Sequence, residues 1–552
     1  MKTLICCLNS KYVHASLAPF YLLSGVRAYC DGSISAKVFE GTINGDMDDL
    51  LEKISAEKPQ IISFSCYIWN IEKTLELAKK IKATLGATII LGGPEVAYRS
   101  EEILESYSFI DFVISGEGEE SFPALLNALA NGQDFSKIGG LSYRDNGIRK
   151  NPEQPLKIPY LSPYSEDYFE NLKGRISYIE TSRGCPYRCA FCLSGRCGPV
   201  RFFPLEQVKK DIIALANSGT KTVKFVDRTF NANPSRADEI LQFIIDNYKK
   251  EIPKGVCFHF EIAGDILKDS TLKILESAEK GLFQLEIGMQ SFNEETLKAI
   301  NRKTDTKKLI ENIKKLVSFG NMHIHIDLIA GLKGEDIKSF ENSFNIGFGL
   351  RANMLQLGFL KLLYGAEMRE NRDEFPCEFG SAPPYEVTST PWLTEKEIES
   401  LKKCEDALER LYNSGRFLET VDYLLSVGYT PFKLFSEIGE KINGQGLNLW
   451  DYTEKIYLYF KDKENIDDMI LREKMVCDLL LSVSNPKIPE GLKVQDKIFK
   501  RVKKTLAEKL GADVKTAILY SENKVLAVSK NSETNLFGRK RPTYFQLEEF
   551  IE

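Results

Sequence analysis

The chain contains 552 residues, of which 43% are hydrophobic and 27% are charged. These proportions are ordinary for a globular protein, and the length suggests roughly three to four domains of about 150 residues. No stretch approaches the roughly 18–20 apolar residues that would span a bilayer. The first ten residues, MKTLICCLNS, lack the apolar region of a signal peptide, so we expect a cytoplasmic protein.

The formal net charge of −5 gives no overall attraction to nucleic acid, and we expect neither a nucleic-acid partner nor a membrane. GRKRP, residues 538–542, is a small basic patch that we expect to be a solvated loop. Twelve cysteines are modest usage for this length. In a reducing compartment they are expected to be thiols or metal ligands rather than disulfides.

Residues 1–135 alternate short apolar runs with helical patterns, which predicts a doubly wound α/β domain with a parallel sheet. Strands are expected at 3–8, 36–41, 61–67, 87–93 and 112–118, and a helix at 70–86. Ligands bind at the carboxyl ends of such strands, so the turns there define the expected pocket. These turns contain Asn9, Ser10, Gly92, Gly93, Pro94, Ser115, Gly116, Glu117 and Gly118.

Residues 136–174 are expected to be a linker, because its prolines break any long helix. Within it, residues 141–151 predict a hairpin with Asn146 and Gly147 at the turn. Residues 175–363 alternate again, with strands expected at 175–182, 222–230, 256–264, 282–291, 323–331 and 354–363. Six strand–helix units predict a partial β/α barrel with its chemistry at the carboxyl ends of the strands.

Residues 364–552 are expected to form a mainly helical accessory domain. A strong amphipathic helix follows Thr394, which is a good N-cap residue. The stretch 516–529, TAILYSENKVLAVS, predicts a late β-hairpin.

The stretch RGCPYRCAFCLSG holds Cys185, Cys189 and Cys192 in the spacing C-x-x-x-C-x-x-C, just after the first barrel strand. Four thiolates are the usual set for a closed cluster or a structural zinc ion. Three closely spaced cysteines can instead hold three irons of a [4Fe-4S] cluster and leave the fourth iron open to a small molecule. The loop position places these thiolates at the mouth of the predicted barrel.

A zinc site is one alternative, and unligated cysteines are another. The fourth zinc ligand would come from Cys197 or from a histidine, which are His14, His259, His323 and His325. Structural zinc loops usually pair two C-x-x-C sequences, and no matching second pair follows here. The spacing therefore favours an iron–sulfur cluster.

With this motif after the first strand of a β/α barrel, the chain resembles the radical S-adenosylmethionine (radical SAM) superfamily. In that family the open iron holds the methionine part of SAM, and one electron from the cluster cleaves SAM to a 5′-deoxyadenosyl radical. The radical then abstracts hydrogen from the substrate. The resemblance implies a [4Fe-4S] cluster and SAM as cofactors, a small-molecule substrate, and an electron donor such as flavodoxin or ferredoxin.

The resemblance also implies roles for residues that follow the first two strands. Phe191 lies where the family places an aromatic side chain beside the adenine, although it can equally cover the cluster. Asp227 follows the second strand, where the family holds the SAM amino group, often with a Gly-Gly-Glu stretch that this chain lacks. Capping of the next helix is the alternative role for Asp227.

Further polar residues lie inside the apolar barrel strands, where unpaired carboxylates are costly. We expect Glu261, Glu286 and Asp327 to act with Asp227 in catalysis, and Glu261 and Gln290 to contact the cofactor. His323 and His325 alternate along one strand and are either polar core residues or proton donors to the substrate.

A doubly wound domain before the barrel resembles the cobalamin-binding branch of the superfamily, over residues 1–363. In that branch the corrinoid lies over the barrel mouth with its tail in the doubly wound domain. Methionine-synthase-type domains carry D-x-H-x-x-G, whereas here His14 is present without the aspartate and the glycine. Radical SAM members commonly lack this histidine ligand, and some keep the domain without the cofactor, so both states stay open.

Residues 364–552 resemble an uncharacterised domain fused to this branch. The first interpretation of the chain is a radical SAM enzyme with cobalamin that methylates or rearranges an unactivated carbon. The alternative is a radical SAM lyase without cobalamin, such as a queuine-salvage lyase acting on queuosine 5′-phosphate. A non-catalytic iron–sulfur or corrinoid sensor is the third interpretation.

Overall fold

The computed structural model describes residues 1–156, 160–196, 198–494, 496–536 and 538–551. The chain divides into two compact units. The first unit contains Met1–Gln284, Ile300–Lys303 and Lys361–Val387, and the second contains Leu285–Ala299, Thr304–Leu360 and Thr388–Glu552. Each unit is therefore completed by segments that are far apart in the sequence.

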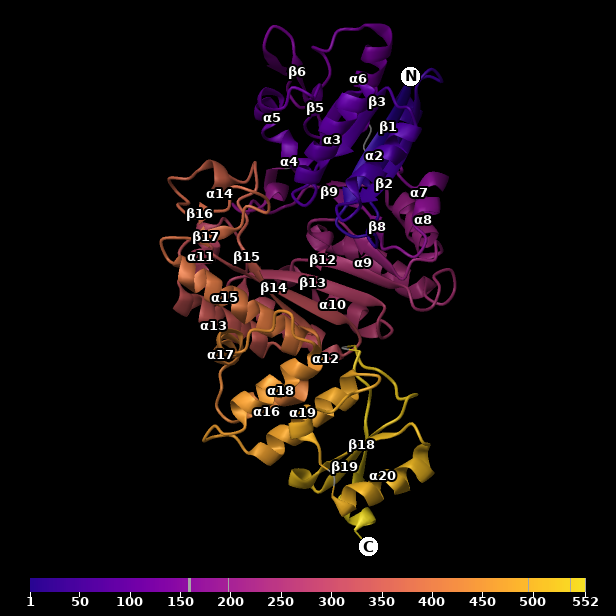
Figure 1. Ribbon diagram of the computed structural model, residues 1–552. Coiled ribbons are helices and arrows are strands. Elements are labelled where there is room, and N and C mark those ends of the chain that lie inside the picture. The colour runs from indigo at the N-terminus through magenta and orange to yellow at the C-terminus, as the bar shows by residue number, and fades with distance from the viewer. Residues whose placement is uncertain (157–159, 197, 495, 537, 552) are drawn as a thin grey trace. The chain divides into compact units, whose positions relative to one another are not determined.

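The first unit opens with a seven-stranded sheet in the order β2-β1-β3-β4-β5-β6-β7 (Figure 1). Strands β1 to β5 pair in parallel, and β6 and β7 add an antiparallel hairpin. The strands are β1 (Lys2–Asn9), β2 (Ser35–Thr42), β3 (Ile61–Ser65), β4 (Thr88–Gly92), β5 (Phe112–Ile114), β6 (Leu141–Arg144) and β7 (Ile148–Lys150). The helices are α1 (Ala18–Tyr29), α2 (Met47–Ala56), α3 (Ile71–Leu85), α4 (Pro94–Ala97), α5 (Ser100–Ser106) and α6 (Gly118–Asn131). The strand order reverses between β1 and β3, and such a switch point is where open α/β sheets bind ligands.

Local sequence explains these elements. Strand β1 is buried along its whole length apart from Lys2, as expected for a parallel strand covered on both faces. Helix α3 ends at Gly86, whose φ of 64° is left-handed. The turn between β6 and β7 has positive φ at Asn146 and Gly147. The predicted doubly wound domain and its following hairpin are confirmed.

The second sheet has six strands in the order β15-β14-β13-β12-β11-β8. The strands are β8 (Ser177–Ile179), β11 (Thr222–Phe225), β12 (Cys257–Ile262), β13 (Phe283–Gln290), β14 (His323–Ala330) and β15 (Met354–Phe359). The helices are α7 (Glu166–Asn171), α8 (Leu205–Ala216), α9 (Pro234–Asn247), α10 (Asp269–Ser277), α11 (Glu294–Ala299), α12 (Thr306–Phe319) and α13 (Ile337–Gly349). In the first unit β11 pairs in parallel with β8 and β12, and in the second unit β14 pairs in parallel with β15. Consecutive strands separated by helices confirm the predicted partial β/α barrel.

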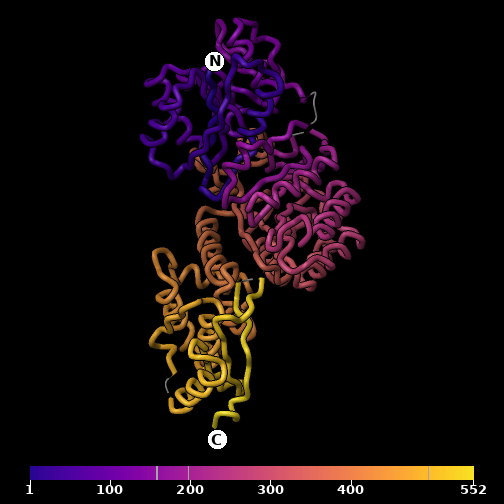
Figure 2. The backbone as a smooth tube through the Cα atoms, turned by 90° about the vertical axis from the view of Figure 1, so that its right-hand side faces the viewer, coloured from indigo at the N-terminus to yellow at the C-terminus, as the bar shows by residue number. Residues whose placement is uncertain are grey.

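Residues 361–387 follow the last barrel strand but belong to the first unit. They contain α14 (Glu367–Glu370) and β16 (Glu378–Phe379). Tyr385 donates a hydrogen bond to the buried carboxylate of Glu95, and the guanidinium of Arg369 lies 3.5 Å from the ring centroid of Tyr364. Figure 2 shows this orange stretch beside the indigo and violet trace of the first sheet. The stretch therefore packs against the doubly wound part of its own unit.

The C-terminal part of the second unit is mainly helical, as predicted. Its helices are α15 (Glu395–Leu408), α16 (Leu418–Ser426), α17 (Pro431–Lys441), α18 (Leu449–Phe460), α19 (Asp468–Ser482) and α20 (Lys497–Leu510). Thr394 and Glu397 form a capping box at the start of α15, and a π-helical turn, Glu409–Asn413, follows the helix. A small antiparallel sheet contains β18 (Lys515–Leu519), β19 (Lys524–Val528) and β20 (Thr543–Gln546). Strands β18 and β19 are the predicted hairpin.

The basic stretch 538–542 differs from its expectation. Arg539 is buried, and its Nη1 lies 2.7 Å from Oδ1 of Asp478 on α19. Asp478 is fully buried and also accepts hydrogen bonds from the backbone and hydroxyl of Thr420. The expectation of a solvated loop is wrong for Arg539, because a buried carboxylate needs a cation or several donors beside it.

Among the helices that the structure describes, none is both long and apolar enough to cross a membrane.

Helices α15 and α17 approach closely at Gly439, where a Cβ would lie 2.2 Å from the carbonyl oxygen of Lys403. Gly439→Ala should lower the free energy of unfolding by about 1–3 kcal/mol, because the two backbones must separate. The control is Gly349→Ala in α13, where a Cβ meets nothing within 4 Å. The control should be neutral or stabilising by up to about 1 kcal/mol, since alanine favours helix. Chemical denaturation measures both, and equal losses would contradict the close approach.

Candidate active site

A short ladder closes the loop that carries the three cysteines. Strand β9 (Ser182–Arg183) precedes the loop and pairs antiparallel with β10 (Arg201–Phe202), which follows it. Gly184 has a φ of 94°, and a Cβ there would lie 2.8 Å from the carbonyl oxygen of Pro199. Only glycine fits where the two arms of the loop come this close. The loop therefore starts and ends just beyond the carboxyl end of β8.

Cys185, Cys189 and Cys192 are free thiols, and each sulfur has a polar neighbour. The hydroxyl of Thr229 lies 3.4 Å from the sulfur of Cys185, and Nη1 of Arg302 donates to the sulfur of Cys189 at 3.7 Å. The backbone N–H of Ser194 donates to the sulfur of Cys192 at 3.4 Å. Burial raises the pKa of Cys189, and Arg302 opposes that shift.

Hydrogen bonds to sulfur are a feature of iron–sulfur ligation, where they adjust the reduction potential. Three free thiols in one loop, with donors aimed at their sulfurs, fit a cluster that keeps one iron open. Backbone hydrogen bonds hold the loop in place, because Ala190 donates to Ile300 and accepts from Met368. Cys197, the fourth ligand in the zinc alternative, lies outside the described residues. Phe191 is half-buried, and its contact with adenine stays a prediction.

Asp227 is fully buried beside the start of the cysteine loop. Its carboxylate accepts hydrogen bonds from the backbone N–H of Thr181 at 3.0 Å, from the Thr181 hydroxyl at 2.7 Å and from the Ser182 hydroxyl. Burial raises the pKa of Asp227 to about 6, against the lowering effect of these donors. The contacts give Asp227 a positioning role for the strand that leads into the loop. Its contact with the SAM amino group stays a prediction.

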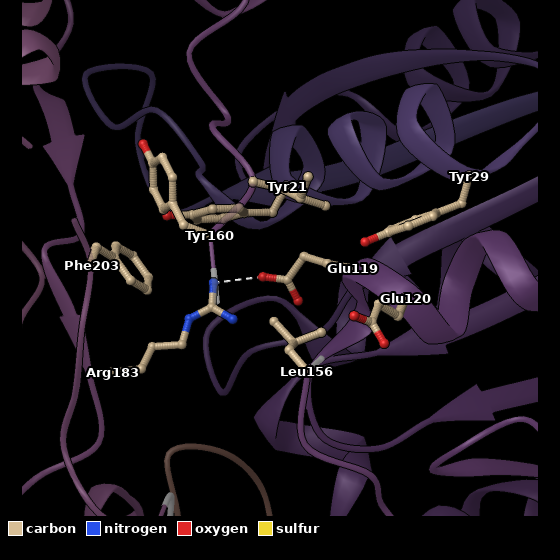
Figure 3. A pocket seen from close by; sticks show the side chains of 9 residues that line it. Tyr21, Tyr29, Glu119, Glu120, Leu156, Tyr160, Arg183 and Phe203 are labelled. Carbon is tan, nitrogen blue, oxygen red and sulfur yellow. Dashed lines mark ion pairs between the residues drawn. The ribbon is translucent and has the colours of Figure 1, made fainter. Parts of the chain in front are cut away.

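Arg183, two residues before the first cysteine, binds three carboxylates. Its guanidinium lies 2.9 Å from Glu117, 2.6 Å from Glu119 and 3.0 Å from Glu180. Figure 3 shows the side chain directed towards Glu119, with the Tyr21 ring nearby. Burial alone would lower the pKa of Arg183, but the carboxylates outweigh burial and raise it well above its ordinary value. Arg183 therefore ties the cysteine loop to the start of α6 in the doubly wound domain.

A small pocket lies beside this arginine (Figure 3). It is lined by Tyr21, Tyr29, Glu119, Glu120, Leu156, Tyr160, Leu161, Arg183 and Phe203. Its polar centre is the ion pair between Arg183 and Glu119. The pocket thus belongs to the contact between the cysteine loop and α6.

The turns at the edge of the first sheet have mostly internal partners. Gly93 has a φ of 103°, and a Cβ there would lie 2.5 Å from the carbonyl oxygen of Cys66, while Gly116 has a φ of 78°. The hydroxyl of Ser115 donates to the carbonyl of Ala97. Burial alone would raise the pKa of Glu117, but Arg201 and Arg183 bind its carboxylate and lower this pKa below its ordinary value. The cofactor contacts predicted for Gly92 and these turn residues stay predictions.

Aromatic side chains are exposed at the switch point between β1 and β3. Tyr12 is 72% exposed and Trp69 is 47% exposed, and the Trp69 ring stacks on Tyr67 with centroids 4.4 Å apart. The Tyr178 hydroxyl lies 2.6 Å from Nδ1 of His14 and orients its ring. Flat apolar surfaces at this edge fit a large planar ring such as a corrin. Neither Tyr12 nor Trp69 was predicted from the sequence to be functional, although both stand just after apolar strands.

The polar residues predicted inside the barrel fall into both units. In the first unit, Glu261 on β12 lies 3.9 Å from the ammonium of Lys224. In the second unit, Glu286 on β13 and Asp327 on β14 both approach His325. Burial alone would lower the pKa of His325, but the two carboxylates outweigh burial and raise it. The structure thus brings these three predicted side chains together.

Gln290 ends β13 with a φ of 70°, which few residues other than glycine adopt. The next residue, Ser291, donates to the buried carboxylate of Glu335 at 2.5 Å, and Ser343 donates to the same oxygen at 3.0 Å. Burial raises the pKa of Glu335 to about 7. Glu335 therefore holds the strained end of β13 in place, a role that the sequence analysis missed.

Comparisons with known proteins assign three regions of the chain. Residues 15–126 match the B12 binding domain, and residues 179–346 match the radical SAM superfamily. Residues 373–539 match a family described as a protein of unknown function, DUF4080. The cysteine loop lies within the second match, and the first sheet supplies most of the first match.

Two curated relatives are methyltransferases. A 2-(S-pantetheinyl)-carbapenam-3-carboxylate methyltransferase from Streptantibioticus cattleyicolor is 27% identical over 307 residues, which cover 51% of this chain and 44% of that protein. TokK, a cobalamin-dependent radical SAM methyltransferase from Streptomyces tokunonensis, is 26% identical over 402 residues, which cover 68% of this chain and 58% of that protein. The chain thus spans about half the length of these two relatives.

Two solved structures share the fold. OxsB, a cobalamin-dependent S-adenosylmethionine radical enzyme with aqua-cobalamin and SAM bound, gives a TM-score of 0.60 at 13% identity and covers 86% of this chain and 78% of its own. TsrM from Kitasatospora setae, with cobalamin and a [4Fe-4S] cluster bound, gives a TM-score of 0.56 at 17% identity. The match covers 67% of this chain and 75% of the TsrM chain. At these identities the likeness concerns the fold alone.

The carboxylates around Arg183 predict that replacing Arg183 destabilises the protein more than replacing Arg201. Arg183→Met leaves Glu117, Glu119 and Glu180 without their shared cation and should cost about 3–5 kcal/mol of unfolding free energy, with loss of cluster iron. Arg201→Met is the matched control, because Arg201 is more exposed than Arg183 and pairs with Glu117. The control should cost about 1 kcal/mol or less. Denaturation curves and iron content measure both, and similar values would contradict the central role of Arg183.

Proposed function

We propose that this chain, a member of the radical SAM superfamily that also carries a B12-binding domain, transfers a methyl group to an unactivated carbon of a small-molecule substrate. The two curated relatives, TokK and the carbapenam carboxylate enzyme, are both methyltransferases, which supports methyl transfer over the lyase alternative. The substrate differs among such relatives, and the domain of unknown function at 373–539 is the region we assign to its selection.

One observation carries the proposal. The cysteine loop and the first sheet lie in the same compact unit, and Arg183 joins them through Glu117, Glu119 and Glu180. Methyl transfer of this kind needs the iron–sulfur site and the corrinoid site at a fixed separation. A rigid ion-paired junction between the two sites supports that requirement.

The chain's own residues have distinct tasks in this proposal. Cys185, Cys189 and Cys192 would hold three irons, and the donors from Ser194 and Arg302 would stabilise the charge on the sulfurs. When bound, the cluster would supply the electron that cleaves SAM, and cobalamin would supply the methyl group.

Other residues would position the cofactors and the substrate. We assign Phe191, Asp227, Glu261 and Gln290 to SAM, and the turns at 92–93 and 115–117 to the corrinoid tail. Asp227 would act through the Thr181 and Ser182 hydroxyls, and Glu335 through the backbone at Gln290. Glu286 and Asp327 would face the reacting groups.

An electron donor such as flavodoxin or ferredoxin would reduce the cluster. The eleven cysteines that the structure describes are free thiols, a state typical of proteins in a reducing compartment. We therefore propose that the chain works in the cytoplasm.

Cofactor content tests the proposal directly. Protein produced without oxygen and with cobalamin supplied should contain about one corrinoid and about four irons per chain. Extraction, absorbance and mass spectrometry measure the corrinoid. A full cluster without corrinoid would overturn methyl transfer and would favour lyase chemistry on modified nucleotides.

The cysteine motif predicts a second result. Cys185→Ala, Cys189→Ala and Cys192→Ala should each abolish cluster absorbance and the formation of 5′-deoxyadenosine from SAM, because a cluster with an open iron needs all three thiolates. Cys30→Ala is the control, since this half-buried thiol lies at the end of α1, outside the cysteine loop. SAM cleavage that survives in the loop variants would contradict the assignment.

A further inference from the structure

Three ionisable side chains of the second unit converge. Glu286 lies on β13, and His325 and Asp327 lie on β14 with one residue between them. Each offers a nitrogen or carboxylate oxygen atom within 4.8 Å of the others. Because alternate residues of a strand point to one face, His325 and Asp327 project on the same side of the sheet.

One nitrogen of the imidazole lacks a hydrogen bond. His325 is 8% exposed, and its Nε2 has no hydrogen-bond partner within the part of the chain that the structure describes. The Oδ1 atom of Asp327 is likewise buried without a hydrogen bond. The two atoms are only 2.9 Å apart, so their separation allows a hydrogen bond but their alignment does not. Buried polar atoms of this kind call for a ligand that is absent from the protein chain itself.

The spacing matches ligands that share an ion. Adjacent ligands of an octahedral ion at about 2.1 Å lie roughly 3.0 Å apart, and opposite ligands lie roughly 4.2 Å apart. The contact of 2.9 Å between Nε2 of His325 and Asp327 fits an adjacent pair. Glu286 lies 3.9 Å from Nδ1 of His325, and its carboxylate is within 4.8 Å of a ligand atom of each of the other two residues.

A neighbouring amide supports this arrangement. Gln356 on β15 stands opposite Asp327 in the strand register, and its side chain hydrogen-bonds to His325. An amide oxygen that accepts from Nδ1–H would leave the lone pair on Nε2 available to a cation. Metal-binding histidines are usually oriented by such a hydrogen bond from their second nitrogen.

We propose that Glu286, His325 and Asp327 bind one divalent first-row cation of the Mn²⁺, Fe²⁺ or Zn²⁺ class. One imidazole and two carboxylates are a donor set that suits these ions, and the two negative charges balance the dication. Three protein ligands leave further positions for water or for an oxygen atom of a substrate. This site uses none of the three cysteines and does not depend on the proposed methyl transfer.

Mn²⁺ is the probe for the test, because it prefers oxygen and nitrogen ligands to thiolates. The full chain, with its cluster oxidised and without SAM or substrate, is titrated with Mn²⁺, and the electron paramagnetic resonance signal of free Mn²⁺ gives the bound fraction. One Mn²⁺ per chain is expected. His325→Ala, Glu286→Gln and Asp327→Asn should each weaken binding by about 100-fold, and Gln356→Leu by about 10-fold.

Glu311→Gln on α12 is the charge-matched control, since Glu311 is exposed and remote from β13 and β14 in the sequence. It should bind Mn²⁺ as the unchanged chain does. The glutamine and asparagine variants keep the side-chain size, so they test the site even where His325→Ala fails to fold. Absence of bound Mn²⁺ at millimolar concentration, or equal binding in all variants, would overturn the proposal and leave a carboxylate–imidazole ion pair. Neither outcome decides the proposed function, which corrinoid content and SAM cleavage test separately.

Discussion

The contact of Arg183 with three carboxylates is the constraint on which the first unit depends. Glu117 and Glu119 stand at the start of α6, and Glu180 follows β8, so the guanidinium joins two sheets and the cysteine loop. None of these charges is fully hydrated, and removing the guanidinium would leave the three carboxylates without the cation that they share. The loop geometry, the entry of α6 and the position of the first sheet are therefore set together rather than one after another.

Buried carboxylates recur in this chain, and each is accommodated differently. Asp227 is surrounded by hydroxyl and amide donors, Asp478 faces Arg539, and Glu335 has a pKa near neutrality and two serine donors. Asp227 and Asp478 have donors on both carboxylate oxygens, whereas both serines bind the same oxygen of Glu335. The group around His325 differs in that two neighbouring residues, His325 and Asp327, each have a buried atom without a hydrogen bond, and these two atoms lie 2.9 Å apart.

Local patterns were sufficient to predict most of the elements and to single out the cysteine loop. Parallel strands such as β1 are continuous apolar runs, and the spacing of Cys185, Cys189 and Cys192 has few chemical meanings. Contacts between distant segments could not be predicted in this way. Nothing near Arg302 in the sequence indicates its hydrogen bond to Cys189, and the basic run around Arg539 gives no sign of the buried Asp478. Glu117 was expected to contact a cofactor because it ends a strand, yet its carboxylate is engaged by arginines whose approach depends on the tertiary fold.

The return of residues 361–387 to the first unit affects the order in which the chain can fold during synthesis. Domains generally fold from the N-terminus as they leave the ribosome. Here the doubly wound sheet emerges early, but Tyr385, which binds the buried Glu95, emerges nearly 300 residues later. Until then Glu95 has Arg99 as its ion-pair partner, and the surface that later receives Tyr364 and Tyr385 stays open to other chains. The first unit is therefore complete only after residues 361–387 have been synthesised. Before that point, the exposed surface of the doubly wound sheet can bind other chains or chaperones.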